Sequence, residues 1–341
     1  MRFLGFGSDA ARIVRRISCL IEASSFRVGI CVSCCFFILS FIGVLIMTLL
    51  DITTAFDSDD RCRELLERLR WPVGPECPRC HTRELARLTA KLLYCKECDY
   101  QFSVTAGTIF HDSHLPLLQW FVATHLLCEA RKGFSANQMK RTIGVSYKTA
   151  WYLCHRIRRA MVESQRPMLD GTVEMDETYI GGKQKGTLRK AGFGDSNKLI
   201  VVGIRQRGGP VRFFHAEDAK SGTLARYIQE NISQHVDVIV TDEYRPYRKA
   251  VGKARHETVN HSAKEYVRFG TDIHTNTVES AFSLLKRGII GTWHRLSAKH
   301  LQAYLDEMSF RFDRRNRSDL FLDTLRHMVT ADPMTFEELV A

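Results

Sequence analysis

The segment GTVEMDETYIGGK, residues 171–183, is the clearest guide to the fold of the C-terminal half of this chain. Apolar and polar residues alternate along it and the pattern stops at Gly-Gly, which is typical of a β-strand that ends in a turn. Asp176 lies inside the strand pattern, where a carboxylate is costly unless it faces a site. We therefore predict a strand with Asp176 directed into a functional site.

The next segments predict more of the same sheet. KLIVVGIRQRGG (198–209) and PVRFFHAED (210–218) have the pattern of a second and a third strand of an antiparallel meander. KSGTLARYIQENI (220–232) then has the pattern of a helix. VDVIVTDEYRPY (236–247) is typical of a buried strand, and it delivers Asp242 at its C-terminal end.

A later helix is predicted to begin near Thr275, within HTNTVESAFSLLKRGIIGTWHRL (274–296). Glu279 and Lys286 are seven residues apart on it, about two helical turns, so they share a face. An Asp within a strand, an Asp at a strand end and a helical Glu form a set that can hold two Mg²⁺ ions beside a substrate phosphate. Taken singly, other acids have simpler explanations, and we interpret these as surface or capping residues: Glu174, Glu177, Asp218 and Glu243.

Upstream, GFSANQMKRTIGVSYKTAWYLCHRIRRAM (133–161) has helix-turn-helix spacing. Ser135 and Ser146 are each placed to cap a helix, and Gly144 permits a tight turn between the two. Eight basic residues and no acidic residue occur between 131 and 160, which favours DNA binding over an ordinary helical hairpin with a solvated basic face. The side chains predicted to face outward toward DNA are Tyr147, Lys148, Thr149, His155 and Arg156.

Four cysteines with metal-ligand spacing precede the helices. Cys77 and Cys80 form one CxxC pair, Cys95 and Cys98 form another, and 14 residues separate the pairs. Two such turns can complete the tetrahedral shell of one Zn²⁺ ion with no open position, so the site should be structural. A redox dithiol would need only one pair.

The composition limits the classes of protein. Lys and Arg number 49 against 38 Asp and Glu, which gives a net charge of +11 and indicates a polyanionic partner, most simply nucleic acid. A basic enzyme with another substrate is the simpler alternative. Eleven cysteines, four of them in metal-ligand spacing, fit a reduced intracellular protein better than a disulfide framework.

The first 46 residues differ from the rest. Residues 28–50 include no charged side chain, so by length they could form a transmembrane helix. The alternative is that the natural protein starts at Met47. The remaining chain divides into a helical lead-in (47–73), a zinc ribbon (74–112), a helix-turn-helix region (115–166) and a catalytic domain with C-terminal helices (171–341).

Three motifs together resemble a known family. MDETYIGGK (175–183), VTDEYRPY (240–247) and HTNTVESAFSLLKRGIIGTWHRLSAKHLQAYLDEMSFRFDRR (274–315) are similar to bacterial insertion-sequence transposases of the zinc-ribbon, DDE-type, ISXO-like group. The resemblance extends over about residues 47–330. It implies a multidomain α+β protein with a zinc ribbon, a helix-turn-helix segment and a ribonuclease-H-like α/β catalytic domain, and a natural start near Met47.

The resemblance also implies roles. Asp176 and Asp242 would be the first two catalytic acids, and the family pattern admits either Asn276 or Glu279 near the third position. We choose Glu279, because Lys286 follows at the spacing expected for the acid, and Asn276 becomes an additional ligand or phosphate contact. Lys286 and Arg287 would contact the DNA backbone.

The implied activity is cleavage at the ends of the element, followed by attack of the new 3′ hydroxyl on target DNA. Such a protein would work in the cytoplasm, at the bacterial nucleoid, as a dimer or larger assembly on DNA. Three alternatives stay open: a DNA-binding regulator without catalysis, a membrane-anchored protein using residues 28–50, and a structure-specific nuclease.

Overall fold

The computed structural model describes residues 47–163, 165–181, 198–260, 263, 265–294 and 296–341. Residues 28–46 lie outside these ranges, so the membrane span stays an alternative and the start at Met47 stays a prediction. Among the described residues, none of the helices combines the length and the apolar character that a membrane crossing requires.

Helices form the first part of the described chain, and they share one core. The core includes Phe56, Leu66, Phe121 and Ile157, and also Leu325 from a helix near the C-terminus. It therefore crosses the boundary predicted between the helix-turn-helix region and the catalytic domain. The helices are α3 (Leu49–Ala55), α4 (Asp59–Arg70), α5 (Leu117–Glu129), α6 (Ala136–Ile143), α7 (Tyr147–Ala160) and α12 (Leu320–Thr330).

The pair α6 and α7 has the predicted ends. The side chain of Ser135 accepts a hydrogen bond from the amide of Gln138, and that of Ser146 accepts one from the amide of Thr149. Gly144 ends α6 with a φ of 71°, a left-handed conformation that costs a residue with a Cβ more than it costs glycine. These local signals produce two helices joined by a short turn.

The cysteine-bearing segment forms a small three-stranded antiparallel sheet in the order β1-β2-β3. Its strands are β1 (Leu85–Arg87), β2 (Leu93–Cys95) and β3 (Gln101–Phe102). Few apolar side chains are buried here, chiefly Leu93 and Phe102 beside the cysteines. A core this small provides little folding energy of its own.

The second sheet has five strands in the order β6-β5-β4-β7-β8. The strands β4 (Thr172–Ile180), β5 (Leu199–Gln206) and β6 (Val211–Ala216) form the predicted antiparallel meander. The strands β7 (Val238–Asp242) and β8 (His256–Val259) pair in parallel, β7 with β4 and β8 with β7. The sheet is therefore mixed, with β4 at its centre.

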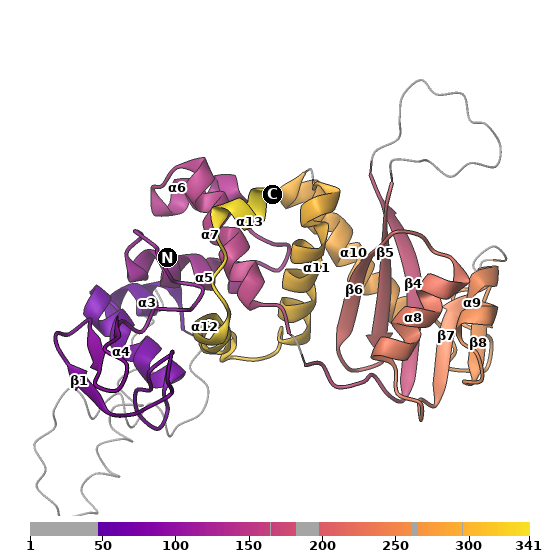
Figure 1. Cartoon of the computed structure of the whole chain (residues 1–341). Coiled ribbons are helices and arrows are strands. Elements are labelled where there is room, and N and C mark those ends of the chain that lie inside the picture. The colour runs from indigo at the N-terminus through magenta and orange to yellow at the C-terminus, as the bar shows by residue number, and fades with distance from the viewer. Residues whose placement is uncertain (1–46, 164, 182–197, 261–262, 264, 295) are drawn as a thin grey trace, which may run out of the picture. The chain divides into compact units, whose positions relative to one another are not determined.

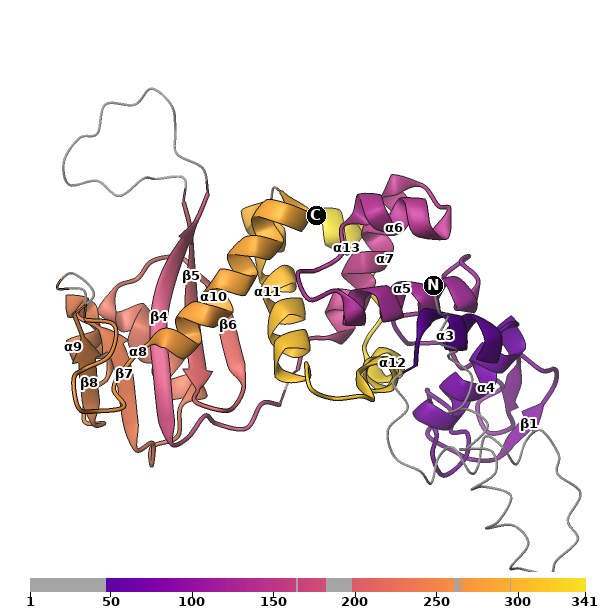
Figure 2. The same cartoon turned by 180° about the vertical axis from the view of Figure 1, so that it is seen from behind.

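Helices cover both faces of this sheet. Helices α8 (Ser221–Asn231) and α9 (Arg245–Ala250) pack on the face formed by Val173 and Met175 of β4. Helices α10 (Asn276–Gly288) and α11 (Ala298–Asp313) pack on the other face. Figure 1 shows α8 in front of the sheet, and Figure 2 shows α10 in front of it from behind.

Some elements were not predicted. Helix α9 and strand β8 follow Asp242, and both are too short for their apolar and polar residues to form a clear periodic pattern. A single π-helical turn, Ile289–Trp293, continues α10, and His294 ends it with a φ of 59°. The last helix, α13 (Phe336–Val340), is short and begins with a capping box at Thr335.

Candidate functional site

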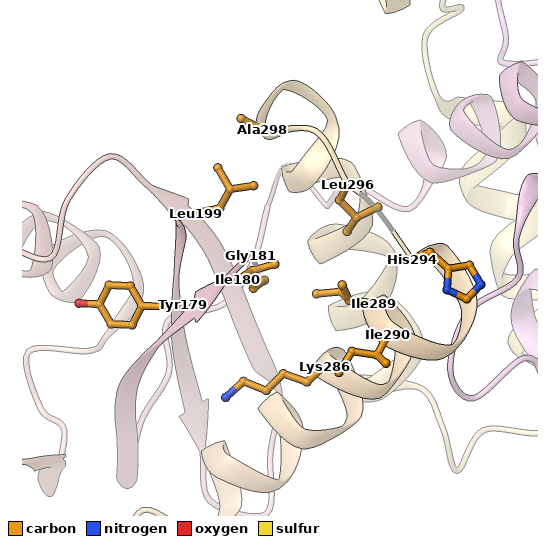
Figure 3. Close-up of a pocket in the computed structure, with 10 residues that line it drawn as sticks. All are labelled: Tyr179, Ile180, Gly181, Leu199, Lys286, Ile289, Ile290, His294, Leu296 and Ala298. Carbon is orange, nitrogen blue, oxygen red and sulfur yellow. The ribbon is translucent and has the colours of Figure 1, made fainter. Parts of the chain in front are cut away.

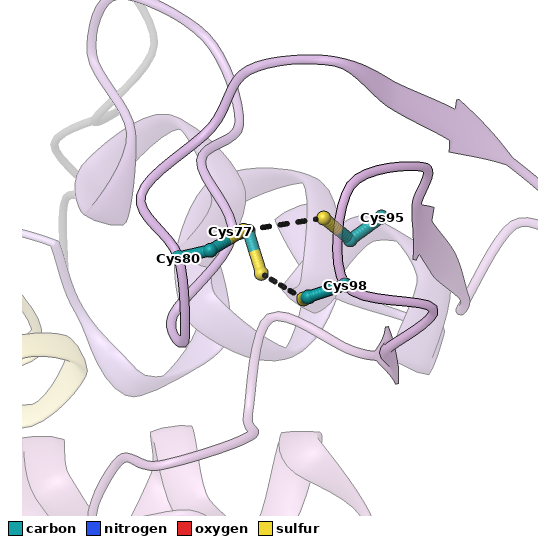
Figure 4. Close-up of side chains that lie close together, drawn as sticks. All are labelled: Cys77, Cys80, Cys95 and Cys98. Atoms are coloured by element: carbon teal, nitrogen blue, oxygen red, sulfur yellow. Dashed lines mark hydrogen bonds between the residues drawn. The ribbon is translucent and has the colours of Figure 1, made fainter.

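The four cysteines come together as predicted. Among the residues that the structure describes, no other set of three or more metal-ligating side chains has all of its ligand atoms within 4.8 Å of one another. The Sγ atoms of Cys77 and Cys98 are 3.7 Å apart, and those of Cys80 and Cys95 are 3.4 Å apart (Figure 4). Four thiolates at these distances match the tetrahedral shell of a structural Zn²⁺ ion.

The first CxxC turn favours a thiolate. Burial opposes ionisation of Cys77, but the backbone amides of Cys80 and Arg79 donate to its sulfur, and its pKa falls to about 6. Burial raises the pKa of Cys98 to about 12. A metal ion must therefore displace a proton from Cys98 on binding, so zinc affinity should increase with pH.

The two predicted aspartates follow the paired part of β4 and β7. In the parallel register of β4 with β7, Glu174 pairs with Val240. Asp176 and Asp242 each follow that pair by two residues, and the charge of Asp242 acts on Asp176. Asp242 is the last residue of β7, and one oxygen of its carboxylate accepts a hydrogen bond from the amide of Tyr244.

The pleat of β4 separates neighbouring acids onto opposite faces. Glu174 and Asp176 share the face that α10 covers, because alternate residues of a strand point the same way. Glu177 points to the other face, where the hydroxyl of Tyr247 on α9 donates to its carboxylate at 2.7 Å. Glu177 is therefore a structural residue, half-buried rather than on the surface, and lies on the other side of the sheet from Asp176.

Carboxylates surround Asp176. Burial, and after it the negative charges of Glu177, Asp242 and Glu279, together raise the pKa of Asp176 to about 7, while the amide of Glu177 opposes the rise. The charges of Asp242 on β7 and Glu279 on α10 thus act on Asp176 of β4, although the ligand atoms of the three acids do not all lie within 4.8 Å of one another. Such an arrangement suits a cation, because a divalent ion would relieve the repulsion.

Helix α10 presents the remaining predicted residues. Asn276 is its first residue and is exposed, while Glu279 is half-buried one turn later and accepts from the hydroxyl of Thr275 at 3.4 Å. Lys286 and Arg287 are exposed two turns further on. The Nε of Arg287 donates to the carbonyl of Ser283.

A pocket of about 710 Å³ adjoins these elements (Figure 3). Its walls come from residues that follow Asp176 on β4 and Glu279 on α10. Lys286 lines it and extends from α10 toward the sheet, and His294 lines it at the end of the π-helical turn. The other lining residues are Tyr179, Ile180, Gly181, Leu199, Ile289, Ile290, Leu296 and Ala298.

The predicted outward face of α7 is correct only at its N-terminal end. Tyr147 and Lys148 are exposed, and the Lys148 amine lies 4.1 Å from the centre of the Phe336 ring. Thr149 is half-buried, and its hydroxyl lies 2.8 Å from that of Ser146 in the helix cap.

The outward orientation predicted for His155 and Arg156 is wrong. Only 2% of His155 and 4% of Arg156 is exposed. The ring of His155 packs against those of Trp151, His300 and Tyr304, so α11 covers this part of α7. The guanidinium of Arg156 donates to the carbonyl oxygen of His111. Tertiary packing thus takes both side chains away from any DNA surface.

Sequence reasoning missed the importance of Glu174. We expected a surface or capping residue. The side chain does cap a helix, but it is fully buried and the helix lies more than 100 residues away in the sequence. The signal that could have identified it was its strand position, two residues before Asp176 on the same face.

Comparison with known proteins shows the family of this chain. Residues 168–313 match the ISXO2-like transposase domain, and residues 57–101 match a transposase zinc-ribbon domain. A protein in transposable element ISH50 of Halobacterium salinarum is 31% identical over 275 residues, which cover 75% of this chain and 91% of that protein. The two matched domains are those of a zinc-ribbon transposase. The chain belongs to the ISXO2-like family of insertion-sequence transposases.

Solved structures show only remote similarity. The Mos1 strand transfer complex aligns with a TM-score of 0.26 at 10% identity, over 61% of this chain and 74% of that chain. A pre-cleavage Mos1 transpososome aligns with a TM-score of 0.21 at 11% identity, over 60% and 77%. Similarity at this level does not define a shared fold.

Proposed function

We propose that this transposase is a DDE-type enzyme that binds the ends of its insertion sequence, cuts them and joins them to target DNA. The observation that carries the proposal is that Asp242 of β7 and Glu279 of α10 both act on the buried Asp176 of β4, next to the part of the sheet where β4 and β7 pair in parallel. The strand order, with β4 at the centre and β7 parallel to it, supports a ribonuclease-H-like catalytic domain.

Asp176, Asp242 and Glu279 would hold the catalytic cations, for which Mg²⁺ is our choice. Their carboxylate oxygens are the hard ligands that Mg²⁺ prefers, and the pKa of Asp176, raised by burial and by the neighbouring carboxylates, fits a cation site. Two such ions, when bound, stabilise the attacking and leaving oxygens of an in-line phosphoryl transfer. No covalent intermediate with the protein is required.

Other residues would hold the DNA. Lys286 and Arg287 are exposed on α10 and would contact backbone phosphates beside the acids, and Asn276 would contact a phosphate or a metal-bound group. Tyr147 and Lys148, with Thr149, would contact the element end from the first turn of α7, in a helix-turn-helix mode. His155 and Arg156 are buried and would not contact DNA. The zinc ribbon would add a second contact.

The partners would be the element ends and the target DNA. Two ends must be cut together, so we propose a dimer or larger assembly on DNA, working in the cytoplasm at the nucleoid. The alternative is a regulator that binds DNA without cutting it, in which the acids have no catalytic role.

The test is cleavage of an element-end duplex by the purified full chain with and without Mg²⁺. We expect cleavage and strand transfer only with the metal, and loss of both by orders of magnitude in Asp176→Asn, Asp242→Asn and Glu279→Gln, with end binding retained. Binding without any metal-dependent cleavage would favour the regulator. Cleavage without strand transfer would favour a nuclease.

The same assay decides the third acid. Asn276→Ala should be milder than Glu279→Gln, because a neutral oxygen contributes less than a carboxylate to holding a divalent cation. The opposite order would assign the third position to Asn276.

A further inference from the structure

We propose that Glu174 is a positioning residue for the catalytic acids: its buried carboxylate fixes the first turn of α10 and so sets the place of Glu279 relative to Asp176. The inference rests on the proposed function, because it concerns the same three acids. Glu174 itself would touch neither DNA nor metal.

One oxygen of Glu174 holds the start of α10. Oε2 accepts hydrogen bonds from the amide of Thr277 at 2.9 Å, from the hydroxyl of Thr277 at 2.7 Å and from the amide of Val278 at 2.9 Å. These amides belong to the first turn of the helix, where backbone donors lack partners within the helix. The residue at the N-cap, Thr275, makes no side-chain capping bond, so Glu174 replaces the local cap.

The other oxygen of Glu174 is neutralised from the opposite side. Oε1 accepts from the Nε of Arg207 at 3.0 Å and lies 3.3 Å from the Nδ1 of His274. Arg207 also donates to Asp272 at 2.7 Å. A fully buried carboxylate is tolerated only when its charge and lone pairs are satisfied, and here both oxygens are.

This cap links two acid-bearing elements directly. Glu174 lies two residues before Asp176 on the same face of β4, and Val278 lies one residue before Glu279 on α10. The hydrogen bond from the Val278 amide to Glu174 therefore joins the residue before Glu279 to the residue two positions before Asp176. Because the carboxylate is buried and paired with Arg207, its hydrogen bonds to the helix are stronger than those of a neutral exposed cap would be.

A second feature brings α10 close to the sheet at the same level. Gly203 of β5 pairs with Asp176, and an added Cβ there would lie 2.6 Å from the Phe282 ring of α10 and 3.2 Å from Val278. The absent side chain at Gly203 thus permits the close approach, and Glu174 fixes where along the strand the helix begins. Ligand positions in metal sites depend on such supporting contacts, whose loss typically costs about 10–100-fold in affinity or activity.

The test uses the full chain and three variants. Glu174→Gln keeps the shape, but its amide nitrogen must meet either the helix amides or Arg207, all of which are donors. Thr277→Val removes one donor and keeps the charge. Asp313→Asn is the matched control, since the Asp313 carboxylate also holds a backbone amide, that of Val211 at 2.8 Å, at a different edge of the sheet.

Three quantities are measured: the affinity for Mn²⁺ by electron paramagnetic resonance, the kcat and KM for cleavage of an element-end duplex, and the Tm. The Asp176→Asn variant lacks one of the three proposed ligands, so the Mn²⁺ signal that it loses is the one from the site of Asp176, Asp242 and Glu279. We expect Glu174→Gln to weaken Mn²⁺ binding and lower kcat by about tenfold or more with KM for DNA unchanged. Thr277→Val should lower the Mn²⁺ affinity and kcat by a smaller factor. Asp313→Asn should lower only the Tm.

The outcomes separate the two proposals. If the wild-type protein binds Mn²⁺ and cuts DNA, and Glu174→Gln loses only thermal stability as Asp313→Asn does, the positioning role is overturned and the proposed function stands. If Glu174→Gln does not fold, unchanged Mn²⁺ affinity and kcat in Thr277→Val overturn the role. If the wild-type protein neither binds Mn²⁺ nor cuts DNA, the proposed function fails and this inference fails with it.

Discussion

The guanidinium of Arg158 on α7 donates to the carboxylate of Glu307 on α11 at 2.6 Å, and both side chains are buried. Glu307 also accepts from Arg311 at 3.0 Å, so one acid neutralises two buried arginines. The pair joins the helix that would read DNA to a helix that packs on the five-stranded sheet.

Glu307→Gln should therefore be strongly destabilising. Removing the charge leaves two buried guanidinium groups without their counter-charge, which typically costs about 3–5 kcal/mol. Urea unfolding measures the free energy of unfolding. Asp57→Asn is the control, because the Asp57 pair with Arg61 is exposed and such pairs contribute about 0–1 kcal/mol. Equal losses of unfolding free energy in Glu307→Gln and Asp57→Asn would contradict the stabilising role of Glu307.

Gly203→Ala should displace α10 from the sheet. The added methyl group meets Phe282 at a distance that no relaxed packing allows, so we expect a loss of about 1–3 kcal/mol in the free energy of unfolding. Cleavage should fall as well, because Glu279 moves with the helix. Gly222→Ala on α8 has open space around its Cβ and should be neutral or slightly stabilising. A harmless Gly203→Ala would show that the helix can move without cost.

Cys77→Ser should release zinc and unfold the ribbon while the rest of the chain stays folded. The ribbon has few buried apolar side chains, so metal binding supplies most of its folding energy. Elemental analysis of the purified protein should find one zinc per chain in the wild type and none in the variant. Cys154→Ala, at a buried cysteine of α7, should keep its zinc. Wild-type protein without zinc would refute the prediction.

Lys148→Ala and Arg156→Ala should act differently. Lys148 is exposed on the first turn of α7, so its loss should weaken binding to the element end, by about 1–3 kcal/mol if it contacts a base. Arg156 is buried and holds a backbone carbonyl, so its loss should lower the free energy of unfolding. Fluorescence anisotropy and urea unfolding separate the effects. Normal end binding by Lys148→Ala would move recognition elsewhere, most simply to the ribbon.

His155 should make the protein sensitive to acid. Burial lowers the pKa of His155 from 6.5 to about 2, so the folded chain keeps the ring neutral while the unfolded chain protonates it below pH 6.5. The unfolded state then binds more protons, and stability decreases as pH falls, by up to about 1.4 kcal/mol per pH unit.

His155→Phe should flatten this dependence between pH 6.5 and 5, measured as the free energy of unfolding in urea at several pH values. His114→Phe, at an exposed histidine, should leave the slope unchanged. A slope that is the same in the wild type and in His155→Phe would show that other groups cause the acid sensitivity.

Local sequence determined much of this protein. The CxxC pairs, the serine caps of α6 and α7, and the alternation along β4 are short-range signals, and each gave the predicted element because its cause lies within a few residues. The order of strands and helices likewise placed Asp176, Asp242 and Glu279 on the predicted elements. These features together sufficed for the resemblance that the family matches confirm.

Only the tertiary structure decided which face of an element is covered and by what. The sequence of α7 alone predicts that His155 and Arg156 are exposed. In the folded chain α11 covers His155, and Arg156 bonds the loop at His111. The sequence around Glu174 alone predicts an ordinary strand acid. In the folded chain the first-turn amides of α10, about a hundred residues later, donate to its carboxylate. The physical reason is the same in each case: burial and charge pairing depend on atoms that are distant in the sequence, and periodicity within one segment contains no information about them.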